Sequence, residues 1–137
     1  MNTPARLREA AEAMMSPAFV ITIPGEPVAK RRPRLGNGRR YTHPDDVEAE
    51  ASTAAILRAT LREPLTGNLA VGCEFYRSTR RRVDVDNLLK HVFDAGNKVA
   101  WVDDSQCTAA FGVIELDRAN PRTVIFISSH SSSLVRE

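Results

Sequence analysis

The order of its apolar patterns limits the folds open to this 137-residue chain more than any other feature. Short runs rich in β-branched and aromatic residues, bounded by turn residues, predict strands over residues 19–23, 69–76, 111–116 and 123–128. Apolar residues at helical spacing predict a helix over about 44–62, and a second helix that follows Asp86 and stops at Gly96-Asn97. The chain therefore interleaves helices with its first three strands and ends in two consecutive strands.

This order of elements favours an α+β fold in a single domain, because domains usually contain about 100–150 residues. A mixed sheet of four to five strands, with the helices packed on one face, would bury the apolar stripes of both helices. We expect this domain to span residues 19–128. Residues 1–18 are expected to form a short amphipathic helix or a frayed tail, residues 24–41 a long irregular loop, and residues 129–137 a loose C-terminal tail.

Composition excludes several other classes of protein. Hydrophobic residues make up 42% of the chain and charged residues 26%, as in globular domains and unlike disordered chains. We see no apolar run of the roughly 20 residues that cross a bilayer and no signal-peptide pattern, so we expect a cytoplasmic protein that does not bind membranes. Cys73 and Cys107 are expected to be reduced thiols, and His43, His91 and His130 lack the spacing of metal-binding or nucleophilic motifs.

Two clusters of basic residues occur in a chain whose net charge is only +2. The first has six basic residues in eleven positions without an acidic one, and the second directly precedes a carboxylate pair. Either cluster alone is equally consistent with a solvated loop, but the two together favour binding to DNA or RNA phosphates. The residues expected to contact nucleic acid are Lys30, Arg31, Arg32, Arg34, Arg39 and Arg40 in the first cluster, and Arg80, Arg81 and Arg82 in the second.

The strongest chemical signal is the pair Asp84 and Asp86, at the predicted junction between a strand and a helix. In an extended backbone, residues two apart point to the same face, and two carboxylates held together favour a cation between them. Mg²⁺ suits such a pair because it prefers hard oxygen ligands and is typically bound by one or two carboxylates plus substrate phosphates. The pair therefore predicts a metal site that acts on a phosphodiester. An EF-hand is excluded, since Leu89 and Ala95 stand where its loop needs Gly and Glu.

Three further residues extend this candidate site. Lys90 follows Asp86 by one helical turn, where its ammonium could neutralise charge that develops on phosphoryl oxygens, although it could equally be a surface lysine paired with Asp86 or Asp94. Asp103 and Asp104 follow an apolar run that could return a carboxylate to the site, although taken alone they are better explained as an ordinary Asp-rich turn. We interpret Asp94 as a helix-surface or salt-bridge residue outside the catalytic set.

Several segments together resemble the RusA family of Holliday junction resolvases, endodeoxyribonucleases often carried by phages and prophages. The similarity rests on D-x-D-N-L-x-K over residues 84–90 with the basic residues before it, on D-D-x-Q over 103–106, and on residues 24–27, 30–34 and 93–95. It covers most of residues 19–127 and is fairly specific. The chain departs from the family pattern at Gly96, where the family usually has Leu, and at Lys98, where it usually has Gly.

The resemblance implies a Mg²⁺-dependent homodimer, with Mn²⁺ as a substitute cofactor, that binds four-way junctions of branched DNA and nicks two strands of like polarity symmetrically. By position, Asp84, Asp86 and Asp104 match the catalytic carboxylates of the family, Lys90 matches its essential lysine, and Asp103 is a neighbouring candidate ligand. A dimer has a physical logic here, because a nearly two-fold symmetric junction needs two sites related by a two-fold axis.

Two other functions are compatible with the same residues. A nuclease with the same metal centre could cut flaps, forks or plain duplex as well as junctions. A DNA-binding accessory protein with purely structural carboxylates would instead bind DNA in a salt-sensitive manner and show no metal-dependent cleavage.

Overall fold

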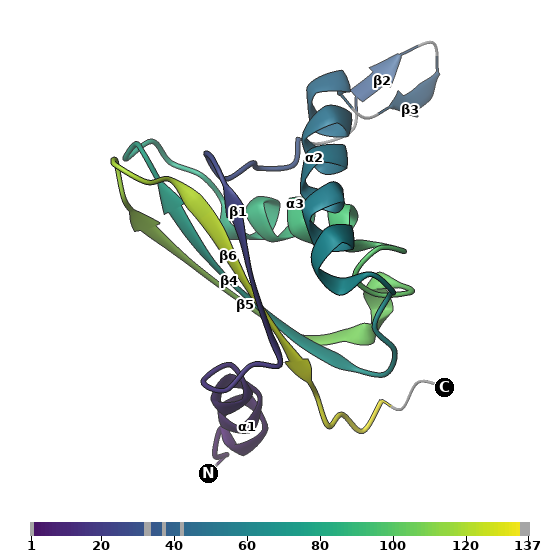
Figure 1. Ribbon diagram of the computed structural model, residues 1–137, viewed down its shortest axis with the longest axis vertical. Coiled ribbons are helices and arrows are strands. Elements are labelled where there is room, and N and C mark those ends of the chain that lie inside the picture. The colour runs from purple at the N-terminus through teal and green to yellow at the C-terminus, as the bar shows by residue number, and fades with distance from the viewer. Residues whose placement is uncertain (1, 32–33, 37, 42, 135–137) are drawn as a thin grey trace.

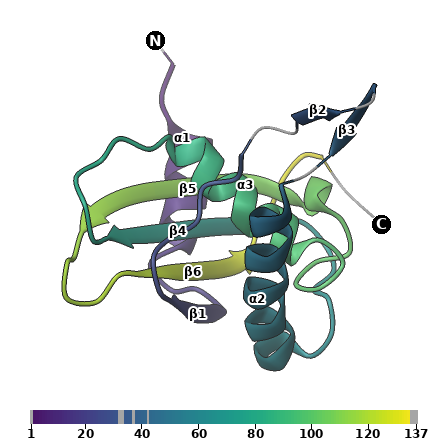
Figure 2. The ribbon, with the colours of Figure 1, turned by 90° about the horizontal axis from the view of Figure 1, so that it is seen from above.

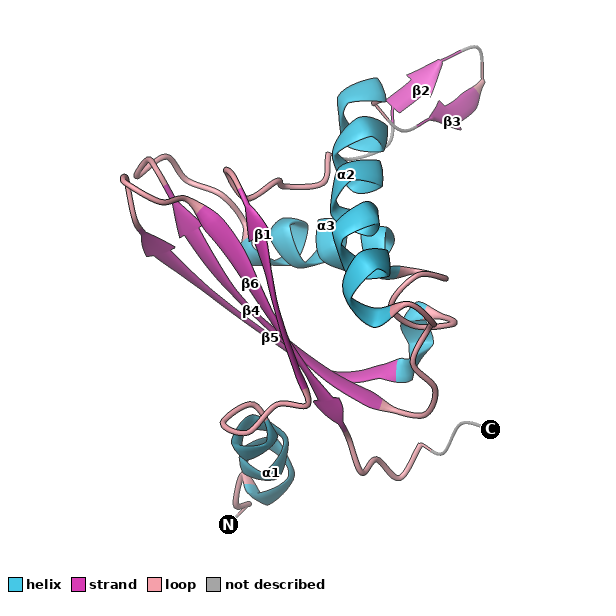
Figure 3. Cartoon of the chain, viewed as in Figure 1, coloured by secondary structure: helices cyan, strands magenta, loops and turns pink. Residues whose placement is uncertain are grey.

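The computed structural model describes the chain except for residues 1, 32–33, 37, 42 and 135–137, and of residues 34–36 and 39–41 it describes only the backbone. Its elements are shown in Figure 1 and, by type, in Figure 3. The helices are α1 (Ala5–Ala13), α2 (Pro44–Leu61), α3 (Val85–Gly96) and the short 3-10 helix η1 (Asp104–Gln106). The strands are β1 (Phe19–Pro24), β2 (Arg34–Gly36), β3 (Arg39–Tyr41), β4 (Leu69–Arg77), β5 (Cys107–Leu116) and β6 (Arg122–Ser129).

Four strands form the main sheet in the order β1-β6-β4-β5. β6 pairs antiparallel with β1 and β4, whereas β4 and β5 pair parallel. A parallel pair needs a crossover connection, and α3 lies in the connection between these two strands. The expected α+β fold with a mixed sheet is therefore confirmed.

The helices α2 and α3 lie on the same face of the sheet, as Figure 2 shows. Alternate residues of β4 and β6 point toward them and form the core, in which each large apolar side chain contributes about 1.5–3 kcal/mol. This packing fixes the position of α3 on the sheet. The main core side chains are Leu57, Val71, Cys73, Phe75, Leu88, Val92, Ile125 and Ile127.

The opposite face of the sheet carries α1. The side chain of Met14, just after this helix, lies over β4, and its Sδ would be 2.8 Å from a Cβ atom at Gly72. Nη2 of Arg6 donates a hydrogen bond of 2.9 Å to the backbone oxygen of Ser131. Residues 5–13 thus form the short helix expected near the N-terminus, and a glycine in β4 leaves room for the segment that follows it.

The segment over residues 24–41 is not a single irregular loop, so that prediction was wrong in part. It contains the antiparallel hairpin of β2 and β3, in which Gly36 is opposite Arg39. The sequence between these strands, Asn37-Gly38, is typical of a two-residue hairpin turn, and Gly38 has a φ of 76°. The arginine-rich strands lack the apolar alternation that usually identifies a hairpin.

Other details agree with the sequence or refine it. β5 begins at Cys107, earlier than expected, because the small residues at 108–110 join the strand although they give little β signal. Cys73 and Cys107 are free thiols, as expected, and burial raises the pKa of both. Among the described residues, each helix is too short or too polar to cross a bilayer.

A tight connection follows α3. A Cβ atom at Gly96 would lie 2.5 Å from the ring of Trp101, so a larger residue there would force the indole to move. Lys98 has a φ of 64°, in the left-handed region where a side chain other than glycine is strained. The two departures from the family pattern therefore act differently: Gly96 permits close packing, whereas Lys98 adds strain.

We expect Lys98→Gly to raise the free energy of unfolding by about 0.5–1 kcal/mol, because relief of the left-handed strain outweighs the extra chain entropy of glycine. Lys98→Ala is the matched control, since it shortens the side chain but keeps Cβ and therefore the strain. Urea denaturation measures both variants. Equal stability of the glycine and alanine variants would contradict the strain at this residue.

Candidate active site

Asp84 and Asp86 lie at the beginning of α3, where both are exposed. Asp84 has an extended backbone at the N-cap position (φ −87°, ψ 130°), and Asp86 belongs to the first turn. The backbone N–H of Asn87 donates to Oδ1 of Asp86 at 3.0 Å, and its side-chain amide lies 3.5 Å from Oδ2 of Asp84. The extended backbone expected across both residues ends at Asp84, because α3 begins at Val85. Both carboxylates nevertheless lie within hydrogen-bonding distance of Asn87.

Lys90 lies one turn farther along α3 and pairs with Asp94. Its Nζ is 2.8 Å from Oδ1 of Asp94, and its side chain is 58% exposed, against 18% for Asp94. Oδ2 of the same carboxylate is 3.1 Å from Nζ of Lys30. The interpretation of Asp94 as a salt-bridge residue is therefore confirmed, and its carboxylate joins two lysines.

Asp104 approaches α3 from the segment after Trp101. Its Oδ1 accepts a hydrogen bond of 2.8 Å from Nε1 of Trp101, whose side chain is fully buried. Burial raises the pKa of Asp104; the hydrogen bond from Trp101 opposes this rise, the charge of Asp94 adds to it, and the charge of Lys90 opposes it. Asp104 is thus close enough to Lys90 and Asp94 for electrostatic interaction.

Asp103 stabilises the turn that carries Asp104. Its Oδ2 accepts a hydrogen bond of 3.0 Å from the backbone N–H of Ser105, and its own N–H donates to Oε1 of Gln106 at 2.9 Å. Gln106 is buried and donates from Nε2 to the backbone oxygens of Leu65 and Gly67. The Asp-rich turn expected from the sequence is therefore the start of η1, with Asp103 as its N-cap. The same short helix brings the carboxylate of Asp104 toward α3.

The carboxylates occur in two parts, one at the start of α3 and one at η1. In the part of the chain that the structure describes, no three His, Cys, Asp or Glu side chains lie close enough together to hold a metal ion alone. The chemistry of the set still fits Mg²⁺, because this ion takes hard oxygen ligands and needs only one or two protein carboxylates when water and phosphate complete its shell. The assignment of Asp84, Asp86, Asp103 and Asp104 as ligands stays a prediction.

The second basic cluster lies beside the first carboxylate pair. Arg80, Arg81 and Arg82 are exposed in the segment between β4 and α3. With Arg77, Val83 and the end of β5 they line a cavity of about 330 Å³. The arginines of this cavity could bind a phosphate, and Asp84 follows the lining residue Val83 in the sequence; their contact with DNA stays a prediction.

The first basic cluster lies on the other side of α3, before and within the hairpin of β2 and β3. Arg34, Arg39 and Arg40 belong to this hairpin, which extends beyond one end of α2 (Figure 1), and only their backbone is described. Arg32 lies outside the described residues. Arg31 is 49% exposed, with Nη1 at 3.7 Å from Oδ2 of Asp45, whereas the side chain of Lys30 is only 12% exposed.

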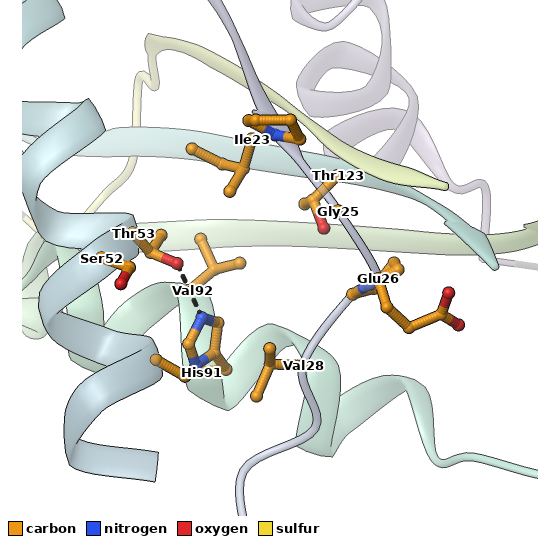
Figure 4. A pocket seen from close by; sticks show the side chains of 12 residues that line it. Ile23, Gly25, Glu26, Val28, Ser52, Thr53, His91, Val92 and Thr123 are labelled. Carbon is orange, nitrogen blue, oxygen red and sulfur yellow. Dashed lines mark hydrogen bonds between the residues drawn. The ribbon is translucent and has the colours of Figure 1, made fainter. Parts of the chain in front are cut away.

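A separate cavity of about 130 Å³ lies between α2, α3 and the segment after β1 (Figure 4). His91 lines it, and its Nε2 shares a hydrogen bond of 2.9 Å with Oγ1 of Thr53. Burial lowers the pKa of His91, which is 4% exposed, so the ring is neutral near pH 7. His91 therefore joins α3 to α2 in the interior of the protein.

Two residues near the site were not identified from the sequence. Glu50 on α2 accepts a hydrogen bond from Nζ of Lys30, and Trp101 supplies the indole donor to Asp104. Glu50 has no local motif that links it to Lys30, twenty positions away. For Trp101 the only available signal was its spacing of three residues from Asp104.

Several known proteins are similar to this chain over most of its length. The chain matches the family described as Endodeoxyribonuclease RusA over residues 24–128. It is 33% identical over 90 residues to the crossover junction endodeoxyribonuclease RusA of Escherichia coli K12, a match that covers 64% of this chain and 75% of that protein. The crossover junction endodeoxyribonucleases of Enterobacteria phage 82 and Shigella sonnei are 32% identical over 90 residues, with the same coverage. The family match includes every candidate carboxylate and Lys90, whereas α1 lies before it.

Proposed function

The chain belongs to the RusA family of endodeoxyribonucleases, and we propose that it resolves Holliday junctions by paired, symmetric nicks. The observation that carries this proposal is the start of α3, where two exposed carboxylates are followed one turn later by an exposed lysine. Carboxylates that hold a metal ion and a lysine that neutralises phosphoryl charge are groups that accelerate phosphodiester hydrolysis. The names of the relatives, crossover junction endodeoxyribonucleases, support the same substrate.

Asp84, Asp86 and Asp104 would hold the metal ion, with Asp103 beside them, and we propose Mg²⁺, for which Mn²⁺ can substitute. Bound there, the ion supplies Lewis acidity for hydrolysis of the phosphodiester. The exposure of Asp84 and Asp86 supports this role, because both carboxylates are accessible to an ion and to DNA. Their like charges also repel each other until a cation neutralises them.

Lys90 would neutralise the negative charge that develops on the phosphoryl oxygens. Its side chain is 58% exposed, and its charge opposes the rise in the pKa of Asp104, which supports a place near that carboxylate. Arg80, Arg81 and Arg82 would hold DNA phosphates on the adjacent side, where their side chains line an open cavity.

The substrate itself favours a homodimer. A four-way junction is nearly two-fold symmetric, so paired nicks need two copies of the site related by a two-fold axis. The hairpin of β2 and β3, with Arg34, Arg39 and Arg40, extends away from the sheet and would reach an arm of the junction. We also propose that the protein acts on such DNA in the cytoplasm.

We expect the purified protein to nick two strands of a synthetic four-way junction in Mg²⁺ and to leave it intact in excess EDTA. Flaps, forks and plain duplex are cut in parallel, and the junction is expected to be cut fastest. Equal cutting of all four DNAs would indicate a nuclease of relaxed specificity instead. Salt-sensitive binding without cleavage would indicate a DNA-binding accessory protein and would overturn the proposal.

A further inference from the structure

Lys30 lies at a junction of three segments. Its backbone N–H donates a hydrogen bond of 2.9 Å to the backbone oxygen of Asn87 in the first turn of α3. Its ammonium hydrogen-bonds to Glu50 of α2 and pairs with Asp94 of α3 at 3.1 Å. Burial lowers the pKa of Lys30, but these two carboxylates more than compensate, and the pKa is raised overall. Lys30 is therefore a charged, partly buried group that joins the loop to both helices.

Asp94 connects Lys30 to Lys90 of the candidate active site. One oxygen, Oδ2, is engaged by Lys30, and the other, Oδ1, is 2.8 Å from the ammonium of Lys90. An exposed lysine paired at i and i+4 is usually held only weakly, because both partners can move. Here the partner has less freedom, since the side chain of Asp94 is 18% exposed and its second oxygen is bound to Lys30, whose side chain is only 12% exposed.

We infer that Asp94 is a positioning residue that holds Lys90 for the reaction, and that Lys30 fixes Asp94 in place. This inference rests on the proposed function of Lys90. An ammonium already held near the position of the phosphoryl group loses less conformational entropy when DNA binds than one that samples all of its rotamers. The assignment gives Lys30, expected from the sequence to contact DNA, a role inside the protein.

Glu50 provides a matched control for this network. Glu50 and Asp94 both accept from the ammonium of Lys30, but the pair with Lys90 is made by Asp94. Asp94→Asn and Glu50→Gln therefore each remove one carboxylate charge beside the same partly buried lysine, and Asp94→Asn also loosens Lys90. A purely structural role for the network predicts similar effects of the two variants.

The test measures two quantities for each variant: the single-turnover rate of nicking of the four-way junction, and the Kd of the protein for that junction without divalent metal. We expect Asp94→Asn to slow nicking by about tenfold or more while Kd changes by less than about threefold, because misplaced catalytic groups lower the rate rather than binding. Glu50→Gln is expected to stay within about threefold of the parent in both quantities. Lys30→Met should resemble Asp94→Asn, Lys30→Arg should restore part of the rate, and the double variant should be no slower than the slower single variant.

A second measurement does not depend on cleavage. The mobility of the Lys90 side chain, from ¹³C relaxation at its Cε, should increase in Asp94→Asn and stay unchanged in Glu50→Gln. If Asp94→Asn does not fold, Asp94→Glu, which displaces the carboxylate, is expected to give the same result. Equal nicking rates for the Asp94 and Glu50 variants, or unchanged Lys90 mobility, would overturn the inference. A parent protein that nicks no DNA would refute the proposed function, and the relaxation data would still decide whether Asp94 holds Lys90.

Discussion

Asp86→Asn is expected to slow junction nicking by about a thousandfold or more, because loss of a metal-ligating carboxylate removes several kcal/mol of transition-state stabilisation. The substitution keeps the shape of the side chain and removes its charge. Asp86 is exposed in the first turn of α3, and its Oδ1 accepts a hydrogen bond from the N–H of Asn87, which an amide oxygen can also accept. The fold and the affinity for the junction should therefore be preserved, as measured by circular dichroism and by Kd without divalent metal.

Asp45→Asn is a suitable control for this prediction. Asp45 is an exposed acidic residue in the first turn of α2, as Asp86 is in the first turn of α3. The same chemical change is expected to alter nicking by less than about threefold, since surface substitutions usually change free energies by less than about 0.5 kcal/mol. If the Asp45 and Asp86 variants cut the junction at similar rates, Asp86 is not a metal ligand.

The parts of the fold that were predicted from the sequence are those with strong local signals. The helix expected over about 44–62 is α2 (Pro44–Leu61), because its proline start and acidic first turn are local signals, although Val47 and Ala51 of its expected apolar stripe are exposed. The hairpin of β2 and β3 was missed, since its strands are too short and too basic for a period of two to emerge. The parallel pairing of β4 with β5 is a tertiary property that strand patterns do not encode.

The same distinction applies to the candidate site. Seven consecutive positions contain Asp84, Asp86 and Lys90, so the sequence alone showed that they lie together at the start of one helix. The contact of Lys30 with Asp94 joins residues 64 positions apart, and only the packing of the loop against α3 brings them together. Lys30 therefore looked like one more member of a basic cluster, although in the structure its side chain is largely covered and pairs with two carboxylates.

Trp101→Ala is expected to lower the free energy of unfolding by about 3–5 kcal/mol, a large part of the stability of a small domain. The indole is fully buried, and its ring centroid lies 5.8 Å from that of Phe93 in a tilted arrangement. The close approach of Gly96 to the indole also means that a large cavity would remain, because the glycine has no side chain with which to fill it. Urea or thermal denaturation measures the loss.

Trp101→Phe separates packing from the hydrogen bond to Asp104. Phenylalanine fills most of the space but lacks Nε1–H, so Asp104 loses its 2.8 Å donor while the core remains largely packed. If this donor orients Asp104 for the metal, nicking should slow by about tenfold at a modest loss of stability. Phe93→Leu, which disturbs the same aromatic pair but not Asp104, is the control and should leave the rate within about threefold of the parent. Equal slowing in the two variants would assign the effect to packing and would remove Trp101 from the support of the site.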